Sequence, residues 1–156
     1  MKLEWQILTE TENWVAINKP SGLLSVPDRE GKETSLKQLL QKKYGSIFAV
    51  HRLDRETSGV ILFAKNESAH RHLSQQFEQR STIKIYGGLV VGKPEPLTQM
   101  IDSPIKEHSG ILGKMIIHRN GKPSQTEYTV AEVLSPYSWV TFQLHTGRTH
   151  QIRVHM

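Results

Sequence analysis

The sequence of 156 residues contains no cysteine. Disulfide bonds, cysteine nucleophiles and metal sites built from thiolates are therefore excluded, although this absence alone does not fix the cellular compartment. Long apolar runs are missing as well, since the longest spans about five residues and a membrane-spanning helix needs about 20. No basic segment followed by an apolar one opens the sequence. We therefore expect a cytoplasmic protein that does not enter a membrane.

Hydrophobic residues are few, at 37% of the sequence, while the charged fraction of 22% is ordinary. The length suits one domain with a real core, and no internal repeat or low-complexity tract interrupts it. Acidic residues are fewer than basic ones, which gives a formal net charge of +5. This excess is compatible with a polyanionic partner such as nucleic acid, but charge alone is weak evidence for one.

The spacing of apolar residues predicts both helices and strands. One helix is predicted to begin at Thr34 and to end before Gly45, and a second to begin at Asn66. Two short strands are predicted within 4–17, further strands over 60–64, 82–89, 126–133 and 139–144, and hairpins within 91–121. This order predicts an α+β class, with a mostly antiparallel mixed sheet and a few packed helices.

The loop before the apolar run 60–64 is much more polar than a structural connection requires. Residues 51–56 carry one aspartate, Asp54, among four other polar or charged side chains. Reactive side chains tend to lie on loops held by a rigid strand, so Asp54 is a candidate for chemistry. From composition alone, a solvated turn with a few ion pairs is an equally good interpretation.

The order of residues in this loop is specific. His51-Arg52-Leu53-Asp54 followed by Thr57-Ser58-Gly59 resembles the H-R-L-D-x-x-T-S-G signature of the RluA-type pseudouridine synthases. Three further blocks resemble segments of the same family, in the family's order, and they lie at 18–23, 121–128 and 146–155. The resemblance therefore spans most of the chain.

The resemblance implies an isomerase that detaches uracil from its ribose in RNA and rejoins it through a carbon atom. It implies that Asp54 is the essential carboxylate, which attacks either the sugar or the uracil ring; the two alternatives stay open. Arg153 is implied as its ion-pair partner. Tyr86, in an element that resembles the family's K-x-Y, is implied as an aromatic wall for the target base. From the residues alone, a tyrosine packed in a sheet is the commoner outcome.

The target uridine has to be flipped out of its stack in folded RNA. We predict that Arg52, with His51 beside it, fills the gap and that Arg148 contacts a phosphate. Lys19 and Lys84 are further candidates for RNA contact. The reaction needs no cofactor and no metal, and the histidines match no zinc spacing. The expected partner is a stem-loop of ribosomal or transfer RNA, bound by a monomer.

Two other functions are compatible with parts of the sequence. Asp54 and Glu56 could form the carboxylate pair of a glycoside hydrolase, but side chains two residues apart need not converge. A basic RNA-binding domain without catalysis is the second alternative. Because relatives continue beyond the position of Met156, we expect a single catalytic domain over 1–156 that lacks its C-terminal part, in which Thr149 caps a short, weakly anchored helix. An inactive fragment is the corresponding alternative.

Overall fold

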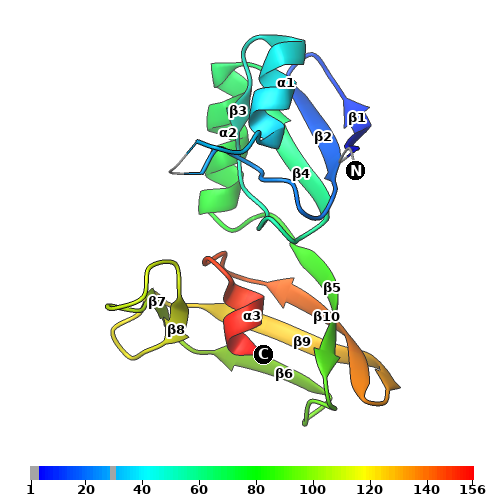
Figure 1. Cartoon of the computed structure of the whole chain (residues 1–156), viewed down its shortest axis with the longest axis vertical. Helices are drawn as coiled ribbons and strands as arrows, with labels where there is room; N and C mark the ends of the chain where they lie inside the picture. Colours follow the sequence, from blue (N-terminus) through cyan, green and yellow to red (C-terminus); the bar gives the residue numbers. More distant parts are fainter. Residues whose placement is uncertain (1–3, 29–30) are drawn as a thin grey trace. The chain divides into compact units, whose positions relative to one another are not determined.

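The structure is a computed structural model that describes residues 4–28 and 31–156. The chain forms two compact units, Met1–Ser81 and Thr82–Met156, drawn in Figure 1. The sheets are built from antiparallel strand pairs, and the described residues also form three helices, so the predicted α+β class is confirmed. No helix of the described residues is long and apolar enough to cross a membrane. A single catalytic domain over 1–156 stays a prediction.

The first unit is a four-stranded sheet with two helices. Its strands lie in the order β1-β2-β4-β3. Their bounds are Gln6–Glu10 for β1, Trp14–Lys19 for β2, Phe48–Ala49 for β3 and Gly59–Ala64 for β4. The helices are α1, Leu36–Tyr44, and α2, Glu67–Glu78. The strands predicted within 4–17 and over 60–64 are thus confirmed.

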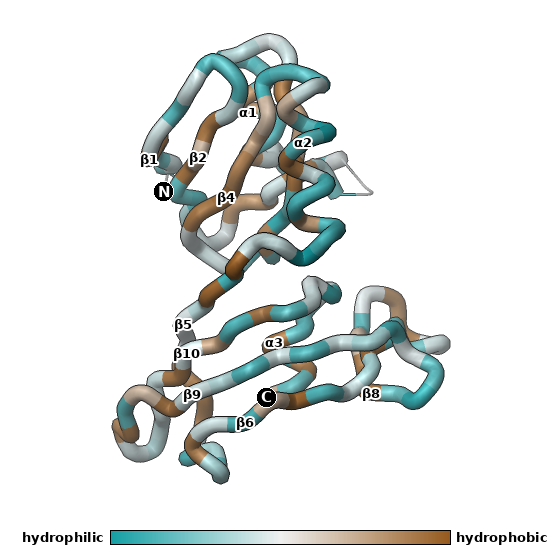
Figure 2. Tube along the Cα trace, turned by 180° about the vertical axis from the view of Figure 1, so that it is seen from behind, coloured by the Kyte–Doolittle hydropathy of each residue, from teal (hydrophilic) through white to brown (hydrophobic). Residues whose placement is uncertain are grey.

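The pair β2 and β4 forms the centre of this sheet and the most apolar part of the unit, as Figure 2 shows. Val15 and Ile17 of β2 and Ile61 and Phe63 of β4 are fully buried. β4 is not buried along its whole length, because Val60 near its start is 59% exposed. β4 nevertheless gives the polar loop before it a stiff support, since it is hydrogen-bonded on both sides.

The helix boundaries follow from side-chain caps. Asn66 caps α2 as predicted, and its side-chain oxygen accepts a hydrogen bond from the Ala69 amide. The cap of α1 is Ser35 rather than Thr34. Ser35 and Gln38 form a reciprocal capping box, and this pair satisfies two amides where a lone threonine would satisfy one.

The second unit holds a larger sheet, a small hairpin and a short helix. The sheet order is β5-β10-β9-β6, with β5 at Ile85–Val91, β6 at Thr98–Asp102, β9 at Gln125–Leu134 and β10 at Tyr137–Leu144. The hairpin pairs β7, Ile105–Glu107, with β8, Met115–Ile117. The helix is α3, Gln151–His155. The hairpins predicted within 91–121 are confirmed.

Within the second unit, one face of the larger sheet is covered by packed side chains. Tyr128, Val140 and Phe142 form its core, against which Tyr86 and Ile152 of α3 pack. In β5, Tyr86 lies on the opposite face from Ile85 and Leu89. The face that carries Ile85 and Leu89, here called the isoleucine face, is the open one, because Ile85 is 65% and Leu89 60% exposed.

Candidate active site

Asp54 lies on the connection between β3 and β4, in a short turn. The Thr57 amide donates a hydrogen bond to the Asp54 carbonyl at 3.1 Å and closes this turn. The Asp54 side chain is half-buried, whereas Leu53 before it is buried and points into the unit. The carboxylate is therefore presented next to an apolar anchor at the edge of the core.

Ser25 holds the residue directly before Asp54. The Ser25 hydroxyl donates to the Leu53 carbonyl at 2.7 Å and accepts from the Leu53 amide at 3.1 Å. Ser25 is 3% exposed, so this hydroxyl saturates both main-chain groups of Leu53 away from water. Ser25 was not among the predicted site residues. A serine between apolar residues in 23–26 was the available signal for it.

The segment 19–22 holds the residues directly after Asp54. The Gly22 amide donates to the Arg55 carbonyl at 2.9 Å, and the Ser21 hydroxyl donates to the Glu56 carbonyl at 2.8 Å. Gly22 has a positive φ of 84°, which few other residues adopt without strain. The resemblance of 18–23 to the family therefore has a physical basis, because this segment shapes the turn that carries Asp54.

Lys19 is the largest fully buried side chain and a structural cation. Its ammonium donates to the carbonyls of Leu23 at 2.7 Å, Pro20 at 2.9 Å and Arg55 at 3.0 Å. Burial lowers the pKa of Lys19 below its usual range, and the charges of Glu56 and Asp54 oppose that shift. All three ammonium hydrogens are used inside the unit, so the contacts show a structural role for Lys19. A contact between Lys19 and RNA stays a prediction.

His51 ties the start of the loop to its neighbours. Its Nε2 accepts a hydrogen bond from the Leu62 amide at 3.1 Å, and its ring stacks on Phe77 of α2 with centroids 4.5 Å apart. Nε2 must be unprotonated to accept this bond. An RNA contact by His51 stays a prediction; what the contacts show is an anchor.

The other charged residues of the loop differ in their surroundings. Arg55 forms an ion pair with Glu33, with Nη1 and Oε1 2.9 Å apart. The Arg55 Nε also lies 3.6 Å from Oε1 of Glu56. Arg52 is exposed beside them, and no ion pair among the described residues includes it. The structure thus shows Arg52 as an exposed guanidinium of this loop, and its contact with RNA stays a prediction.

Tyr86 and Lys84 lie at the start of β5, in the second unit. Tyr86 is half-buried and pairs with Phe142 of β10 in the strand register. The Lys84 ammonium lies near Gly147, where an added Cβ would be 3.9 Å from Nζ. Lys84 is thereby brought next to the late basic block 146–155. The pairing of Asp54 with Arg153, a residue of this second unit, stays a prediction.

Gln151 is the centre of the late basic block. Its side-chain oxygen accepts from the Thr146 hydroxyl at 2.8 Å and the Arg148 amide at 2.9 Å. Its side-chain nitrogen donates to the Gln125 carbonyl and the Thr126 hydroxyl, both at 3.0 Å. Gln151 is 2% exposed and uses its full hydrogen-bonding capacity. The quoted motif contained Gln151, but its role was not predicted.

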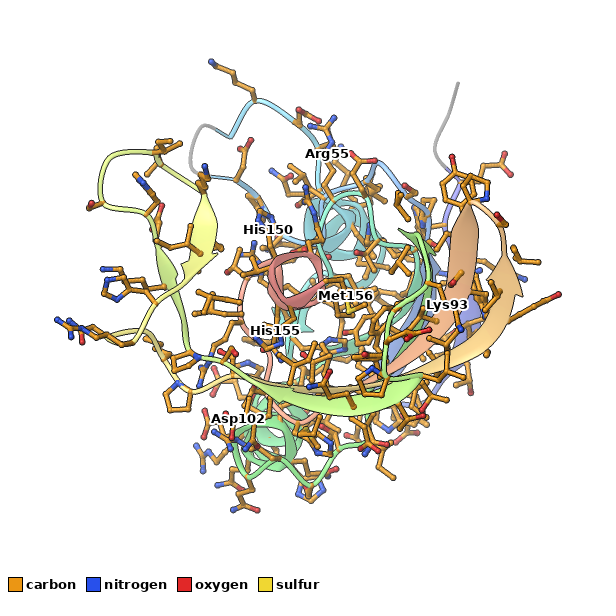
Figure 3. All side chains as sticks on the ribbon, turned by 90° about the horizontal axis from the view of Figure 1, so that it is seen from below. Arg55, Lys93, Asp102, His150, His155 and Met156 are labelled. Atoms are coloured by element: carbon orange, nitrogen blue, oxygen red, sulfur yellow. The ribbon has the colours of Figure 1, made fainter. Side chains whose placement is uncertain are left out.

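The same network extends through α3, which Figure 3 views end-on with His150 and His155 labelled. The His155 Nε2 lies 3.0 Å from the Ser103 carbonyl, and its Nδ1 lies 2.9 Å from the Thr126 hydroxyl. A carbonyl only accepts, so Nε2 carries the proton and donates it. Because Gln151 and His155 both bind to the sheet, the predicted weak anchoring of this helix is wrong.

The beginning of α3 also differs from the prediction. Its N-cap is His150, in a left-handed conformation with φ of 55°, and not Thr149. No side-chain cap bond is found at this helix start, and the Gln151 side chain instead accepts from the Arg148 amide, which precedes the helix. Arg153 is exposed on α3, and the Arg148 Nε donates to the Pro123 carbonyl at 3.2 Å.

Comparison with known proteins identifies the family. The family model for RNA pseudouridylate synthases matches residues 13–156. The chain belongs to the RNA pseudouridylate synthase family. Enzymes of this family are isomerases that act on RNA, so the reaction class implied by the sequence is confirmed.

Curated relatives agree with this assignment. The dual-specificity RNA pseudouridine synthase RluA of Salmonella typhi is 41% identical over 153 residues, which are 96% of this chain and 70% of the relative. The RluA protein of Vibrio vulnificus is 43% identical over 158 residues, which are 97% of this chain and 63% of the relative. The chain thus spans about two thirds of the length of these synthases.

Solved structures of the family have the same fold. Human RNA pseudouridylate synthase domain containing 1 has a TM-score of 0.82 at 27% identity, over 98% of this chain and 64% of that one. Human RNA pseudouridylate synthase domain containing 4 has a TM-score of 0.75 at 30% identity, over 96% of this chain and 62% of that one. The α+β fold is therefore that of pseudouridylate synthase domains.

Proposed function

We propose that this chain converts a uridine in folded ribosomal or transfer RNA to pseudouridine, with Asp54 as the essential carboxylate. The observation that carries the proposal is the clamp around Asp54: the main chain of Leu53, Arg55 and Glu56 is bound by buried or ordered groups of 19–25. A carboxylate held this way has a fixed approach to a bound nucleotide, which covalent attack on a sugar or a base requires.

The remaining roles follow the family resemblance. We propose that Arg52 occupies the gap left by the flipped uridine, because it is exposed beside Asp54. Tyr86 is proposed as the stacking wall and Arg153 as the cation that pairs with Asp54. The relatives named above are described as having dual specificity, so more than one RNA is proposed as substrate. A cytoplasmic monomer is proposed as the working form.

The experiment compares the chain with Asp54→Ala on bulk RNA from cells that lack the gene. New pseudouridines are mapped by chemical labelling and primer extension. We expect signal at defined positions from the native chain, and a loss on the order of 10³-fold or more with Asp54→Ala. Glu56→Gln is the matched control, because it removes a carboxylate two residues away; we expect nearly native activity from it.

Each result has a distinct meaning. Equal loss in both variants would favour a reaction that uses two carboxylates, as in glycoside hydrolases. Full activity of Asp54→Ala would overturn the proposed role of Asp54. RNA binding without any pseudouridine from the native chain would favour the non-catalytic RNA-binding alternative.

A further inference from the structure

Positive charge within the second unit lies in two segments, which are the late basic block, with Arg148 and Arg153, and the segment 103–124. The segment 103–124, here called the hairpin region, contains β7, β8 and the loops around them. It holds four basic residues and one acidic residue, which are Lys106, Lys114, Arg119, Lys122 and Glu107. The strand segments 82–102 and 125–144 hold two basic and four acidic residues. The hairpin region thus carries a charge of +3, and these strand segments carry −2.

The charge of the hairpin region is not neutralised by ion pairs. None of the ion pairs found among the described residues includes any of its four basic side chains. Its one carboxylate is engaged otherwise, because Glu107 Oε1 accepts from the Gly113 amide at 2.6 Å. Lys114, Arg119 and Lys122 are exposed. These three side chains are therefore exposed cations that form no ion pair with any residue of 4–28 or 31–156.

The base of the hairpin region is fixed in place. Ile105 is 1% exposed, and its amide and carbonyl exchange hydrogen bonds with the carbonyl and amide of Lys122 at 3.0 and 2.8 Å. An added Cβ at Gly121 would lie 2.7 Å from the Ile105 nitrogen, so the two main chains approach as closely as glycine permits. The exposed cations are therefore carried by an ordered support.

Both ends of the hairpin region are bonded to the late basic block. The Ser103 carbonyl accepts from His155 of α3, and the Pro123 carbonyl accepts from the Arg148 guanidinium at 3.2 Å. Helix α3 also contacts β8, and the two elements lie side by side in Figure 1. Arg148, predicted from the sequence as a phosphate contact, is thereby placed at the edge of the hairpin region.

We infer that the hairpin region and Arg148 form a surface that binds the phosphate backbone of the RNA substrate. This inference rests on the proposed function, since it takes RNA as the partner. Several exposed, unpaired cations on an ordered support suit a row of phosphates, because each contact releases a bound counterion from the RNA. These contacts position the RNA without reading its sequence.

The test measures the salt dependence of RNA binding with two triple variants. The hairpin variant is Lys114→Gln, Arg119→Gln and Lys122→Gln. The control is Lys37→Gln, Lys42→Gln and Arg71→Gln, which removes the same number of positive charges from α1 and α2. Unfractionated transfer RNA is titrated between about 0.05 and 0.3 M KCl, where salt affects such binding strongly. The kcat/KM for pseudouridine formation is measured over the same range as a second readout.

We expect the hairpin variant to bind about tenfold more weakly at about 0.1 M salt, with a log–log salt slope smaller by about 2 than that of the native chain. The control should keep the native slope. Equal slopes for the two variants, in binding and in kcat/KM, would overturn the inference. Asp54-dependent pseudouridine formation together with equal slopes would overturn only the hairpin surface. Absence of both RNA binding and pseudouridine in the native chain would overturn the proposed function with it.

Discussion

The Asp54 loop and the late basic block are both irregular segments, yet they are held in opposite ways. In the first unit, groups of 19–25 bind the main chain of the loop. In the second unit, the block's own side chains, Gln151 and His155, reach out to β9 and to Ser103. The loop around Asp54 thus receives support, whereas the late block supplies its own.

This difference separates structural from reactive residues within each motif. Because the Asp54 loop is held by its main chain, its exposed side chain Arg52 stays available to a ligand. In the late block, two side chains are used for folding, and Arg153 is the exposed cation left on α3. The Asp54 loop and the late basic block therefore differ in how many of their side chains are used for folding and how many stay exposed.

The largest effect on this comparison is expected from Gln151→Ala. The variant would lose four buried hydrogen bonds and leave the Arg148 amide without its partner, so the free energy of unfolding should fall by about 4 kcal/mol. Denaturant titration followed by circular dichroism measures it. Gln143→Ala, at a half-buried position on β10, is the control and should cost less than about 1 kcal/mol. Similar losses in the free energy of unfolding for the two variants would mean that the Gln151 side chain does not stabilise the late basic block.

A smaller effect is expected from Lys19→Met, which keeps the length of the side chain but removes its donors. Three carbonyls, of which that of Arg55 belongs to the Asp54 loop, would lose a charged partner, while the desolvation cost of the ammonium would disappear. The net loss in the free energy of unfolding should be about 3 kcal/mol. Amide hydrogen exchange over 53–56 should speed up in the variant. Unchanged exchange there would show that the loop does not depend on this cation.

Ser25→Ala tests whether the clamp on Leu53 matters for the reaction. Both main-chain groups of Leu53 would become unsatisfied, which should cost about 2 kcal/mol in unfolding free energy. The kcat for pseudouridine formation should fall at saturating RNA, because Asp54 follows Leu53 directly. Ser35→Ala, also a buried serine but the cap of α1, should cost about 1 kcal/mol and leave kcat unchanged. If kcat fell equally in Ser35→Ala, the specific role of Ser25 would be refuted.

The smallest effect concerns a cluster in the first unit that lies outside the candidate site residues. The Tyr44 hydroxyl donates to Glu10 at 2.6 Å, and burial together with this bond raises the pKa of Tyr44 to about 12. In the unfolded chain the Tyr44 hydroxyl ionises near pH 10. The raised pKa of Tyr44 therefore stabilises the native state fully below pH 10, and this stabilisation is lost as the pH rises through about 12. Tyr44→Phe should flatten this fall between pH 10 and 12, as followed by denaturant titration. An unchanged profile would show that Tyr44 does not titrate as described.

Local patterns were sufficient for most of the secondary structure and for the family. The predicted strands, the α2 cap at Asn66 and the hairpins within 91–121 follow from nearest neighbours along the chain, where side-chain periodicity and caps act. The cap of α1 was misplaced by one residue, because Thr34 and Ser35 are both good caps and only the bond to Gln38 distinguishes them. The motif around Asp54 identified the reaction class for the same reason, since it is contiguous.

The sequence by itself therefore determined the fold class, the family and the identity of the candidate reactive residues. The tertiary structure alone decided that Lys19 is buried, that Ser25 binds Leu53 from 28 positions away, and that Gln151 links α3 to β9. It also decided that the isoleucine face of β5 is the open one. The physical reason is that hydrogen bonding and burial depend on groups brought together across the chain, and periodicity reports only neighbours.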